Sequence, residues 1–370
     1  MKHTTYILGA GCSHYAGLPL QSNFTKELLA ARDFGPGPSR AMVRYLDRFV
    51  HRVFDHAKNA DAKSWPELED IFTCIDLAAN TGHHLGREYP PAELRTVRRV
   101  LIARTARMLH QAYSSAKNRK TSQLAQLRHF LDAIDLADSY FVSLNWDVSL
   151  EAVLEESRKG GSISISYGQG IYRARLPEGD RVIEVLKGDG DPLVEVTKMH
   201  GSVNWLYCDC CRRAFWFAAS DVPHIADQLL TQEEWRQIRP NGKSKPRWSC
   251  PRCTGVELGT RIATFSYRKA LDFPMFQRSW LRAEEALRRS SRWVFIGYSL
   301  PGADYEFKQL LKRVEVSKPK RPTILTVTGG RPEMAAKTRL NYEKFFGKSV
   351  KLGQTFFDDG LTKRVVSRIA

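Results

Sequence analysis

Seven cysteines occur in the chain, and four of them form two pairs with the same spacing. Cys208-x-x-Cys211 is followed, after 38 residues, by Cys250-x-x-Cys253. Four thiolates in two such knuckles form the ligand set of a closed, tetrahedral zinc site. The spacing therefore predicts one structural Zn²⁺ that stabilises a small lobe and leaves no open coordination position for catalysis.

The remaining cysteines leave two alternatives open. Cys210 offers a different first pair, Cys208-x-Cys210, although the two-residue spacer of the second knuckle favours Cys211 as the ligand. A disulfide framework is the other alternative, but we expect no secretory signal in this sequence, and Cys12 and Cys74 are left over. Metal binding is therefore the favoured interpretation.

Polar residues and glycines follow three apolar segments that have the pattern of buried strands. The segments and the residues that end them are 4–8 with Gly9-Ala10-Gly11-Cys12-Ser13, 139–143 with Asn145-Trp146-Asp147, and 194–199 with His200-Gly201-Ser202. Ligands of open α/β sheets bind at the carboxyl ends of the strands. The pattern predicts a ligand site assembled from these three strand ends.

The first strand end is rich in glycine. Gly9 and Gly11 permit a tight turn and a close approach of backbone N–H groups to a phosphate. The spacing to Gly17 is not the Gly-x-Gly-x-x-Gly of dinucleotide-binding dehydrogenases, and no Gly-Lys-Ser/Thr of a P-loop follows. A phosphate-binding loop and a plain glycine turn therefore remain alternatives for this segment taken alone.

The other two strand ends carry residues suited to catalysis. The Asn145 amide can orient a water molecule or a ribose hydroxyl, and His200 can accept a proton near neutral pH. Each position also has a structural alternative. Asp147 can cap a helix predicted over 148–157, and a lone histidine such as His200 is often structural.

The ordered set of segments resembles that of the sirtuins. In that family a Gly-Ala-Gly-x-Ser loop, an Asn-x-Asp strand end, a His-Gly pair, four zinc-binding cysteines and a Gly-x-Ser loop occur in this order. The matching residues are Gly9-Ala10-Gly11-Cys12-Ser13, Asn145-Trp146-Asp147, His200-Gly201, the four cysteines and Gly297-Tyr298-Ser299. Over about residues 5–346 the chain looks most like the sirtuin-like NAD-hydrolysing proteins of bacterial anti-phage defence, through segments 66–72, 199–205 and 297–304.

The resemblance implies an α/β fold: a Rossmann-like parallel sheet with an inserted helical module and a small four-cysteine zinc-ribbon lobe. It also implies a regulated NAD⁺ glycohydrolase that yields nicotinamide and ADP-ribose, with Asn145 and His200 as the catalytic residues. The residues expected to bind NAD⁺ are Gly9, Ala10, Gly11, Ser13, Asn145, Asp147, Gly297 and Ser299. The alternatives are an NAD-dependent protein deacylase and a non-catalytic NAD or ADP-ribose sensor that gates a partner protein.

Two departures from the sirtuin pattern bear on the activity. Deacetylating sirtuins have a Phe-Gly-Glu segment in their peptide groove, whereas this chain has Ile-Ala-Thr-Phe-Ser-Tyr at 262–267. The asparagine that sirtuins tend to place after the last sheet strand is replaced by Thr-Gly-Gly at 328–330, which puts that ribose contact in doubt. The loss of the peptide groove favours hydrolysis of NAD⁺ over deacylation.

These residues imply one interrupted α/β domain. We expect its core at 1–38, 136–203 and 261–350, a helical module at 39–135, a zinc lobe at 204–260 and a tail at 351–370. Helices are predicted over 21–32, 148–157, 301–314 and 358–369, and further strands at 292 and 323–327.

Composition indicates a cytoplasmic globular enzyme, because the 370 residues contain no apolar run of about 18 that would span a membrane. The net charge is +17, and residues 91–130 hold nine Arg or Lys against one Glu. Arg95, Arg98 and Arg99 lie at helical spacing and predict a basic helix face. That face could contact a second copy, an activating partner or, less favoured, nucleic acid, and a solvated surface is the plainer alternative.

Overall fold

The computed structural model describes most of the chain. The described residues are 3–14, 17–30, 37–55, 65–118, 122–156, 164–179, 181–186, 193–240, 246–263, 274–302, 304–327, 332–347 and 350–353. The helix expected over 358–369, the segment 328–330 and most of 262–267 lie outside them. No helix among the described residues is long and apolar enough to cross a membrane.

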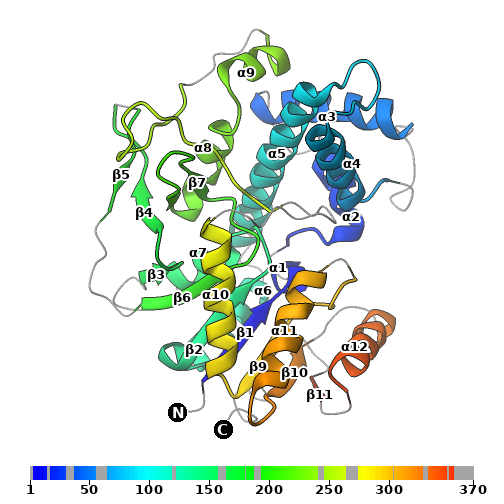
Figure 1. Cartoon of the computed structure of the whole chain (residues 1–370), viewed down its shortest axis with the longest axis vertical. Coiled ribbons are helices and arrows are strands. Elements are labelled where there is room, and N and C mark those ends of the chain that lie inside the picture. Colours follow the sequence, from blue (N-terminus) through cyan, green and yellow to red (C-terminus); the bar gives the residue numbers. More distant parts are fainter. Residues whose placement is uncertain are drawn as a thin grey trace.

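Seven parallel strands form the main sheet, in the order β11-β10-β9-β1-β2-β6-β3 (Figure 1). The strands are β1 (Thr4–Leu8), β2 (Ser139–Ser143), β3 (Ser164–Ser166), β6 (Leu193–Lys198), β9 (Arg292–Ile296), β10 (Thr323–Val327) and β11 (Val350–Gly353). From the central β1 the chain continues to β2 on one side and later returns as β9 on the other. The strand order therefore reverses beside β1, which is where open α/β sheets bind ligands.

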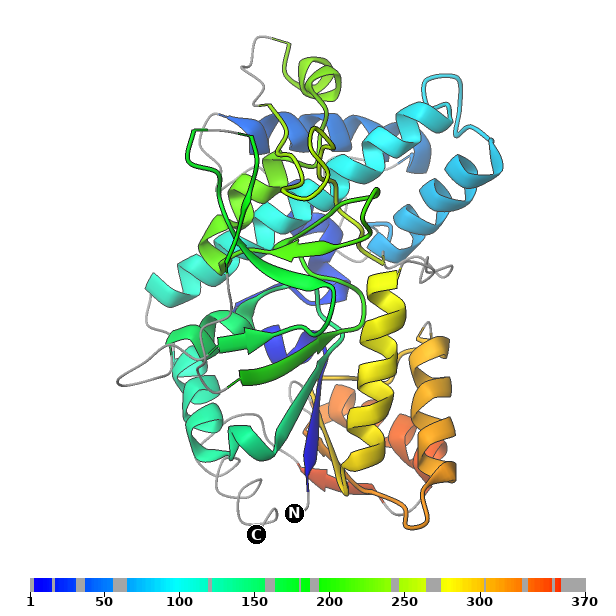
Figure 2. The same cartoon turned by 60° about the vertical axis from the view of Figure 1, so that its left-hand side comes forward.

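Side chains alternate between the two faces of this sheet, and each face is covered by helices. Ile7 of β1 packs in one cluster with residues of α10 (Pro274–Arg289) and α11 (Tyr305–Ser317). Tyr6 lies on the opposite face, where its ring centroid is 5.4 Å from that of Phe130 in α6 (Ser122–Ala133). Figure 2 shows the two layers of helices with the strands between them. A parallel sheet with helices on both faces is the architecture of the α/β class, so the predicted fold class is confirmed.

The predicted helical module is present. It contains α3 (Pro38–Phe54), α4 (Leu68–Thr81), α5 (Pro91–Asn118) and α6, while α2 (Gln21–Leu29) packs beside it (Figure 1). The long helix α5 has a continuous buried stripe that includes Leu94, Val97 and Leu101, as its apolar spacing predicts. The module therefore packs around one central helix.

A second, four-stranded sheet lies apart from the main one. Its order is β5-β4-β8-β7, formed by β5 (Glu184–Val185), β4 (Ile171–Arg175), β8 (Ala214–Trp216) and β7 (Trp205–Tyr207). The expected zinc lobe supplies β7 and β8, whereas β4 and β5 come from the segment between β3 and β6. The same lobe supplies α8 (Val222–Asp227) and α9 (Gln232–Ile238), which contact α5 and α3 respectively. The lobe thus packs against the helical module.

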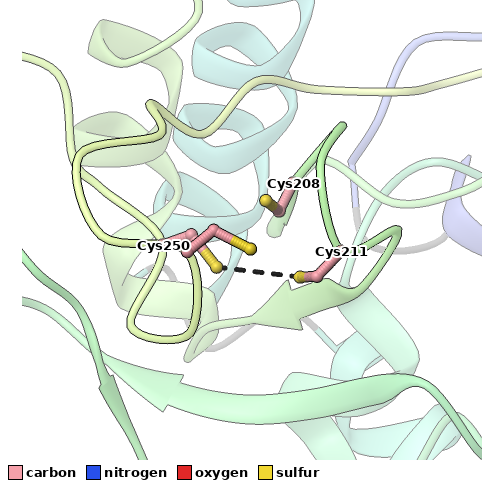
Figure 3. Close-up of side chains that lie close together, drawn as sticks. Cys208, Cys211 and Cys250 are labelled. Atoms are coloured by element: carbon pink, nitrogen blue, oxygen red, sulfur yellow. Dashed lines mark hydrogen bonds between the residues drawn. The ribbon is translucent and has the colours of Figure 1, made fainter.

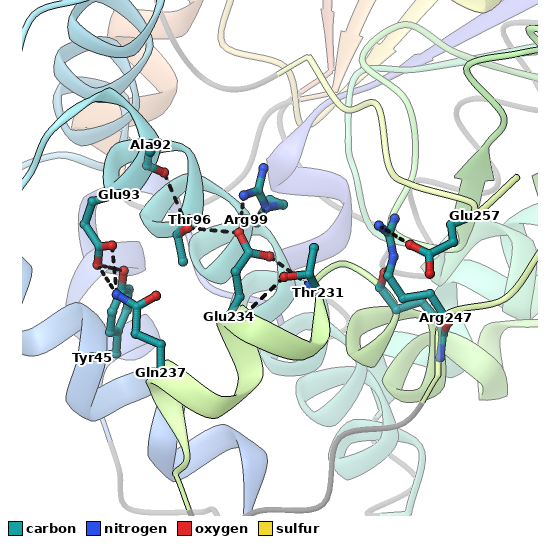
Figure 4. Close-up of polar contacts among 11 residues, drawn as sticks. Tyr45, Ala92, Glu93, Thr96, Arg99, Thr231, Glu234, Gln237, Arg247 and Glu257 are labelled. Atoms are coloured by element: carbon teal, nitrogen blue, oxygen red, sulfur yellow. Dashed lines mark hydrogen bonds and ion pairs between the residues drawn. The ribbon is translucent and has the colours of Figure 1, made fainter.

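The three arginines of the expected basic face are bound within the protein. Arg98 Nε donates to Asp76 Oδ1 on α4 at 2.8 Å, and an amino group of Arg95 donates to the carbonyl of Ala79. Arg99 Nε donates to Glu234 Oε1 on α9 at 2.8 Å, within the polar seam of Figure 4. Arg98 and Arg99 therefore attach α4 and α9 to α5, while Arg95 remains exposed, and contact of this face with a partner or with nucleic acid stays a prediction.

The α5–α9 seam gives a stability prediction. Burial raises the pKa of the Glu234 carboxyl, but the Arg99 guanidinium, the Thr231 N–H and the Thr96 hydroxyl together hold it below its usual value. We expect Arg99→Ala to lower the free energy of unfolding by about 2 kcal/mol at pH 7, as for other hydrogen bonds to a charged group. Urea denaturation measures this loss.

The same experiment has a pH arm. Because the folded-state pKa of Glu234 lies below the unfolded value of about 4.3, the stabilisation is complete above that pH. It is lost as the pH falls through the folded-state pKa, so the difference between wild type and Arg99→Ala should shrink as the solution is acidified below the unfolded-state pKa of about 4.3. The exposed Arg339–Glu343 pair on α12 (Pro332–Phe346) supplies the control, Arg339→Ala, with an effect below about 1 kcal/mol. Equal effects of the two variants would contradict the assignment.

Candidate functional site at the carboxyl edge of the sheet

The predicted strand ends meet at one edge of the main sheet. The residues that follow β1, β2, β6 and β9 extend the pairing of the strands beyond their last residues. Leu144 N–H donates to the Leu8 carbonyl, Met199 N–H to the Ser143 carbonyl, and Gly9 N–H to the Ile296 carbonyl. The structure therefore brings together Gly9–Ser13, Asn145–Asp147, His200 and Gly297.

Gly9 and Gly11 are required by close packing. A Cβ at Gly9 would lie 2.7 Å from the Gly297 carbonyl oxygen, and one at Gly11 would lie 2.8 Å from Gly297 Cα. The N–H groups of Gly9 and Gly11 donate to the carbonyls of Ile296 and Gly297. These two donors are thus engaged within the protein, and the expected approach of their N–H groups to a phosphate does not hold. Residues Ala10–His14 form a short helix, α1, where the sequence indicated a turn.

Gly297 has the tightest surroundings of the site. Its φ is +63°, and a Cβ there would lie 2.1 Å from Cys12 N and 2.4 Å from Gly11 C, both backbone atoms. We expect Gly297→Ala to lower the free energy of unfolding by about 3 kcal/mol or more, from the left-handed φ and the overlap combined. Chemical denaturation measures the change.

The matched control is Gly302→Ala in the same loop, where a Cβ meets no atom within 4 Å. Its stability should be unchanged or slightly raised, because alanine restricts the unfolded chain. Indistinguishable denaturation midpoints for the two variants would show that the 9–13 and 297–298 backbones do not pack as closely as described.

A short hydrogen-bond chain fixes Asn145. Asn145 Nδ2 donates to the Gly9 carbonyl and to Ser13 Oγ, each at 2.9 Å, and Ser13 Oγ donates to Asp147 Oδ2 at 2.6 Å. The direction is determined, because a carbonyl and a carboxylate only accept hydrogen bonds. Both contacts of the Asn145 amide use its nitrogen. Its Oδ1 therefore remains available, among the described residues, to accept a hydrogen bond from a ligand or water.

Asp147 is buried, and its carboxylate also caps the helix that follows. Its Oδ1 accepts from Ser149 N–H at 2.9 Å, at the start of α7 (Ser149–Glu156), while its Oδ2 accepts from Ser13. The helix-capping alternative and a place in the site thus hold together for this residue.

His200 is buried, with its ring fixed by the backbone of β2. Its Nδ1 lies 3.1 Å from the Leu144 carbonyl oxygen, and its own carbonyl accepts from Ala263 N–H. Because the Leu144 oxygen can only accept, the proton of a neutral ring resides on Nδ1. Nε2 is then the ring's acceptor, which is the state that a general base requires.

A buried ion pair beneath the site was missed from the sequence. Lys198, 1% exposed, lies 3.1 Å from Glu151 of α7, and Tyr167 also donates to Glu151. Lys198 donates in addition to the Asp147 carbonyl. The pair thus links the end of β6 to the segment that carries Asn145 and Asp147. A lysine as the last residue of a strand that is otherwise mostly apolar was the available signal, because a buried charge requires a partner.

The remaining predicted site residues lie at the rim of this edge. Ala10 and Ser299 are exposed, and the Ser299 carbonyl accepts from Asn341. The adjacent Tyr298 is buried and donates to Asp304 at 3.0 Å, which fixes the loop after β9. Their part in ligand binding stays a prediction.

The four predicted cysteines converge in the lobe. The Sγ atoms of Cys208, Cys211, Cys250 and Cys253 all lie within 4.8 Å of one another, and Figure 3 shows three of the side chains directed at a common point. Cys211 and Cys250 have their Sγ atoms 3.8 Å apart. Zinc–thiolate bonds of about 2.3 Å place the sulfurs of a tetrahedral site about 3.8 Å apart, so the four fit this ion. Cys210 is exposed and is not one of the four.

No protein-family model and no curated protein matches the sequence. Among solved structures, the chain is similar to a Sir2 homologue in complex with NAD (TM-score 0.42, 12% identity, covering 99% of this chain and 88% of that one). A mutant Sir2 homologue in complex with ADP-ribose gives a TM-score of 0.41 at 12% identity, covering 99% and 91%. Sir2 bound to an acetylated peptide gives 0.36 at 12% identity, covering 99% and 92%. These similarities are distant, so the function is inferred from the chain's own residues.

Proposed function

We propose that the chain is an NAD⁺ glycohydrolase acting at the carboxyl edge of the main sheet. The reaction converts NAD⁺ and water to ADP-ribose, nicotinamide and a proton. The observation that carries the proposal is the fixed orientation of two polar side chains on adjacent strand ends. Asn145 is held through its nitrogen, so its Oδ1 serves as an acceptor, and the Leu144 carbonyl holds the Nδ1–H of His200, which makes Nε2 the basic nitrogen of the ring.

The two acceptors suit attack by water on a ribose. As the C1′–N bond to nicotinamide breaks, positive charge develops on the ribose, and water adds to C1′. Asn145 Oδ1 accepts one hydrogen of that water and orients it, and His200 Nε2 accepts the proton, directly or through a ribose hydroxyl. The Asp147 carboxylate lies next to this site and favours the developing positive charge. It also helps to seat nicotinamide.

The rest of the NAD site follows from the same edge. The exposed Ala10 and Ser299 at the rim, with the buried Ser13, would hold the phosphates and the ribose, while Gly9, Gly11 and Gly297 let the surrounding backbones pack closely at this edge. Zn²⁺ on the four cysteines would have a structural role only, because four thiolates leave no coordination position open for a substrate or water.

The decisive experiment measures nicotinamide and ADP-ribose released from NAD⁺ by the purified full chain, with and without a peptide carrying acetyl-lysine. Equal release of both products without peptide is expected. Release that requires the peptide would instead indicate an NAD-dependent protein deacylase. Binding of NAD⁺ without turnover, over a wide range of protein concentrations, would indicate a sensor that gates a partner.

The resemblance to the anti-phage branch extends the proposal to regulation. An enzyme that destroys NAD⁺ without control would kill its own cell, so we propose a regulated effector of anti-phage defence. Control would come from self-association or from a separate activating protein. Turnover should then rise with protein concentration or with an added activator, and high turnover by dilute protein alone would contradict regulation of this kind.

A further inference from the structure

A hollow of about 840 Å³ lies between α10, the first cysteine knuckle and the turn that joins β3 to β4. This volume is within the range of small-molecule sites. None of Ser13, Asn145, His200 or Gly297 lines it. The hollow is therefore a second place on the molecule where a small ligand could bind.

Four arginines line this hollow: Arg212, Arg213, Arg278 and Arg282. One carboxylate accompanies them, because Glu195 of β6 lies 2.6 Å from Arg282. The other three guanidinium groups have no carboxylate within ion-pair distance among the described residues, and Arg213 lies over the Tyr172 ring at 4.9 Å. Within the described part of the chain, three positive charges of the lining thus have no carboxylate partner.

The turn between β3 and β4 is shaped to receive two of these arginines. Gly168 and Gly170 have φ of +96° and +83°. A Cβ at Gly170 would lie 1.9 Å from an amino nitrogen of Arg278, and one at Gly168 would lie 2.5 Å from an amino nitrogen of Arg282. The guanidinium groups therefore lie against bare backbone, which holds them at the wall of the hollow. Glycine at both positions is a condition for this arrangement.

The amino end of α10 adds to the positive potential. Pro274, the first residue of this 16-residue helix, also lines the hollow. The partial positive charge at a helix amino terminus attracts anions. The helix is fixed to the main sheet, because Trp280 Nε1 donates to the Met199 carbonyl at 3.2 Å. Its arginines are thus presented from a packed element.

We propose that this hollow binds a small organic or inorganic polyphosphate with three or more negative charges, such as the phosphate chain of a nucleoside triphosphate. One guanidinium group can bind two phosphate oxygens, and the charge of such a chain matches the three arginines that have no carboxylate partner among the described residues. The volume of about 840 Å³ matches a small molecule better than a nucleic acid duplex or a protein surface. This site is independent of the proposed NAD⁺ cleavage.

The test is titration calorimetry of the full chain with inorganic tripolyphosphate and, separately, with ATP. We expect saturable binding, weakened about tenfold or more by Arg278→Ala, as for loss of a paired charge-assisted contact. Arg289→Ala, at the other end of the same helix and paired with Glu285, is the control of equal charge and should bind as wild type does. Tighter binding of ATP than of tripolyphosphate would show that the site recognises a nucleotide. Equal binding of the two would show that it recognises the phosphate chain alone.

Three outcomes would overturn the proposal. The first is no heat of binding with either probe at millimolar concentration. The second is an equal loss of affinity in Arg278→Ala and Arg289→Ala, which would indicate attraction to net charge only. The third is binding of an acidic peptide or of an oligonucleotide at this site with no binding of tripolyphosphate. Thermal unfolding of both variants checks that the fold is intact, because Arg278 and Arg289 are both exposed.

Discussion

Alanine at Asn145 or at His200 is expected to lower the turnover number for NAD⁺ cleavage by about 10²- to 10⁴-fold, the range for loss of a positioned proton acceptor. The reason is that the contacts with the backbone and Ser13 orient the two side chains so that Asn145 Oδ1 and His200 Nε2 are their accepting atoms. Alanine removes that atom from the site. Nicotinamide release, measured at saturating NAD⁺ under activating conditions, gives the effect.

An isosteric variant separates orientation from packing. Asn145→Asp keeps the shape but places a carboxylate oxygen against the Gly9 carbonyl and against Ser13 Oγ, where Nδ2 now donates. We expect it to be as inactive as Asn145→Ala. The exposed His129 on α6 supplies the control for His200, and His129→Ala should retain full turnover.

Near-normal turnover in His200→Ala would remove the histidine from the mechanism and leave it as a structural residue. Near-normal turnover in both Asn145 variants would remove the amide from the mechanism. Both results are interpretable only with an intact fold, so unfolding curves are measured in parallel. The loss of one or two hydrogen bonds should cost only about 1–2 kcal/mol of stability.

The strands were predictable because their burial leaves a clear pattern. Segment 139–143 coincides with β2, and the predicted 194–199 is displaced by one residue from β6. Parallel strands covered on both faces are continuous apolar runs, and such runs are easily recognised. β3 and β5 are three and two residues long and β4 is only partly buried, so no comparable pattern marks them. The helices α10 and α12 also went unpredicted.

The candidate site was predictable in its members but not in its contacts. The glycines at 9 and 11 were recognised, yet the reason for them lies 286 residues further along the chain, in the backbone of Gly297. The internal partners of Arg98 and Arg99 on α5 were not predictable for the same reason, because Asp76 and Glu234 belong to other elements. The arginine-lined hollow is formed by four segments that are separate in the sequence, so no pattern within one segment predicts it.

Removal of zinc is expected to loosen the lobe before the main sheet. Four thiolates that fit a tetrahedral site hold β7 and β8 to the second knuckle, and in small lobes of this kind metal binding contributes directly to folding. We predict one zinc per chain by elemental analysis of freshly purified protein. After chelation, amide exchange should accelerate at Cys208 and Cys250, whose N–H groups donate to Arg213 and Val256, and not in β1.

Two neighbouring cysteines provide a matched pair of variants. Cys211→Ser should lower the affinity for zinc by more than about 100-fold, because loss of a partner in the outer shell alone lowers metal affinity by up to that amount. Cys210→Ser should keep it, because Cys210 lies outside the cluster. The opposite result would make Cys210 the ligand, and zinc-free protein from the start would leave four thiols that bind no metal.

The zinc variants also test whether the lobe supports the site. The two chain segments that lead into and out of the lobe both bond to the site, since Val203 N–H donates to the Trp146 carbonyl and Ala263 N–H to that of His200. Trp146 Nε1 in turn donates to the Ala263 carbonyl at 3.1 Å. A lobe loosened by Cys211→Ser should therefore shift His200 and lower NAD⁺ turnover, while Cys210→Ser leaves it unchanged. Full turnover in zinc-free Cys211→Ser protein would show that the strand ends hold His200 without help from the lobe.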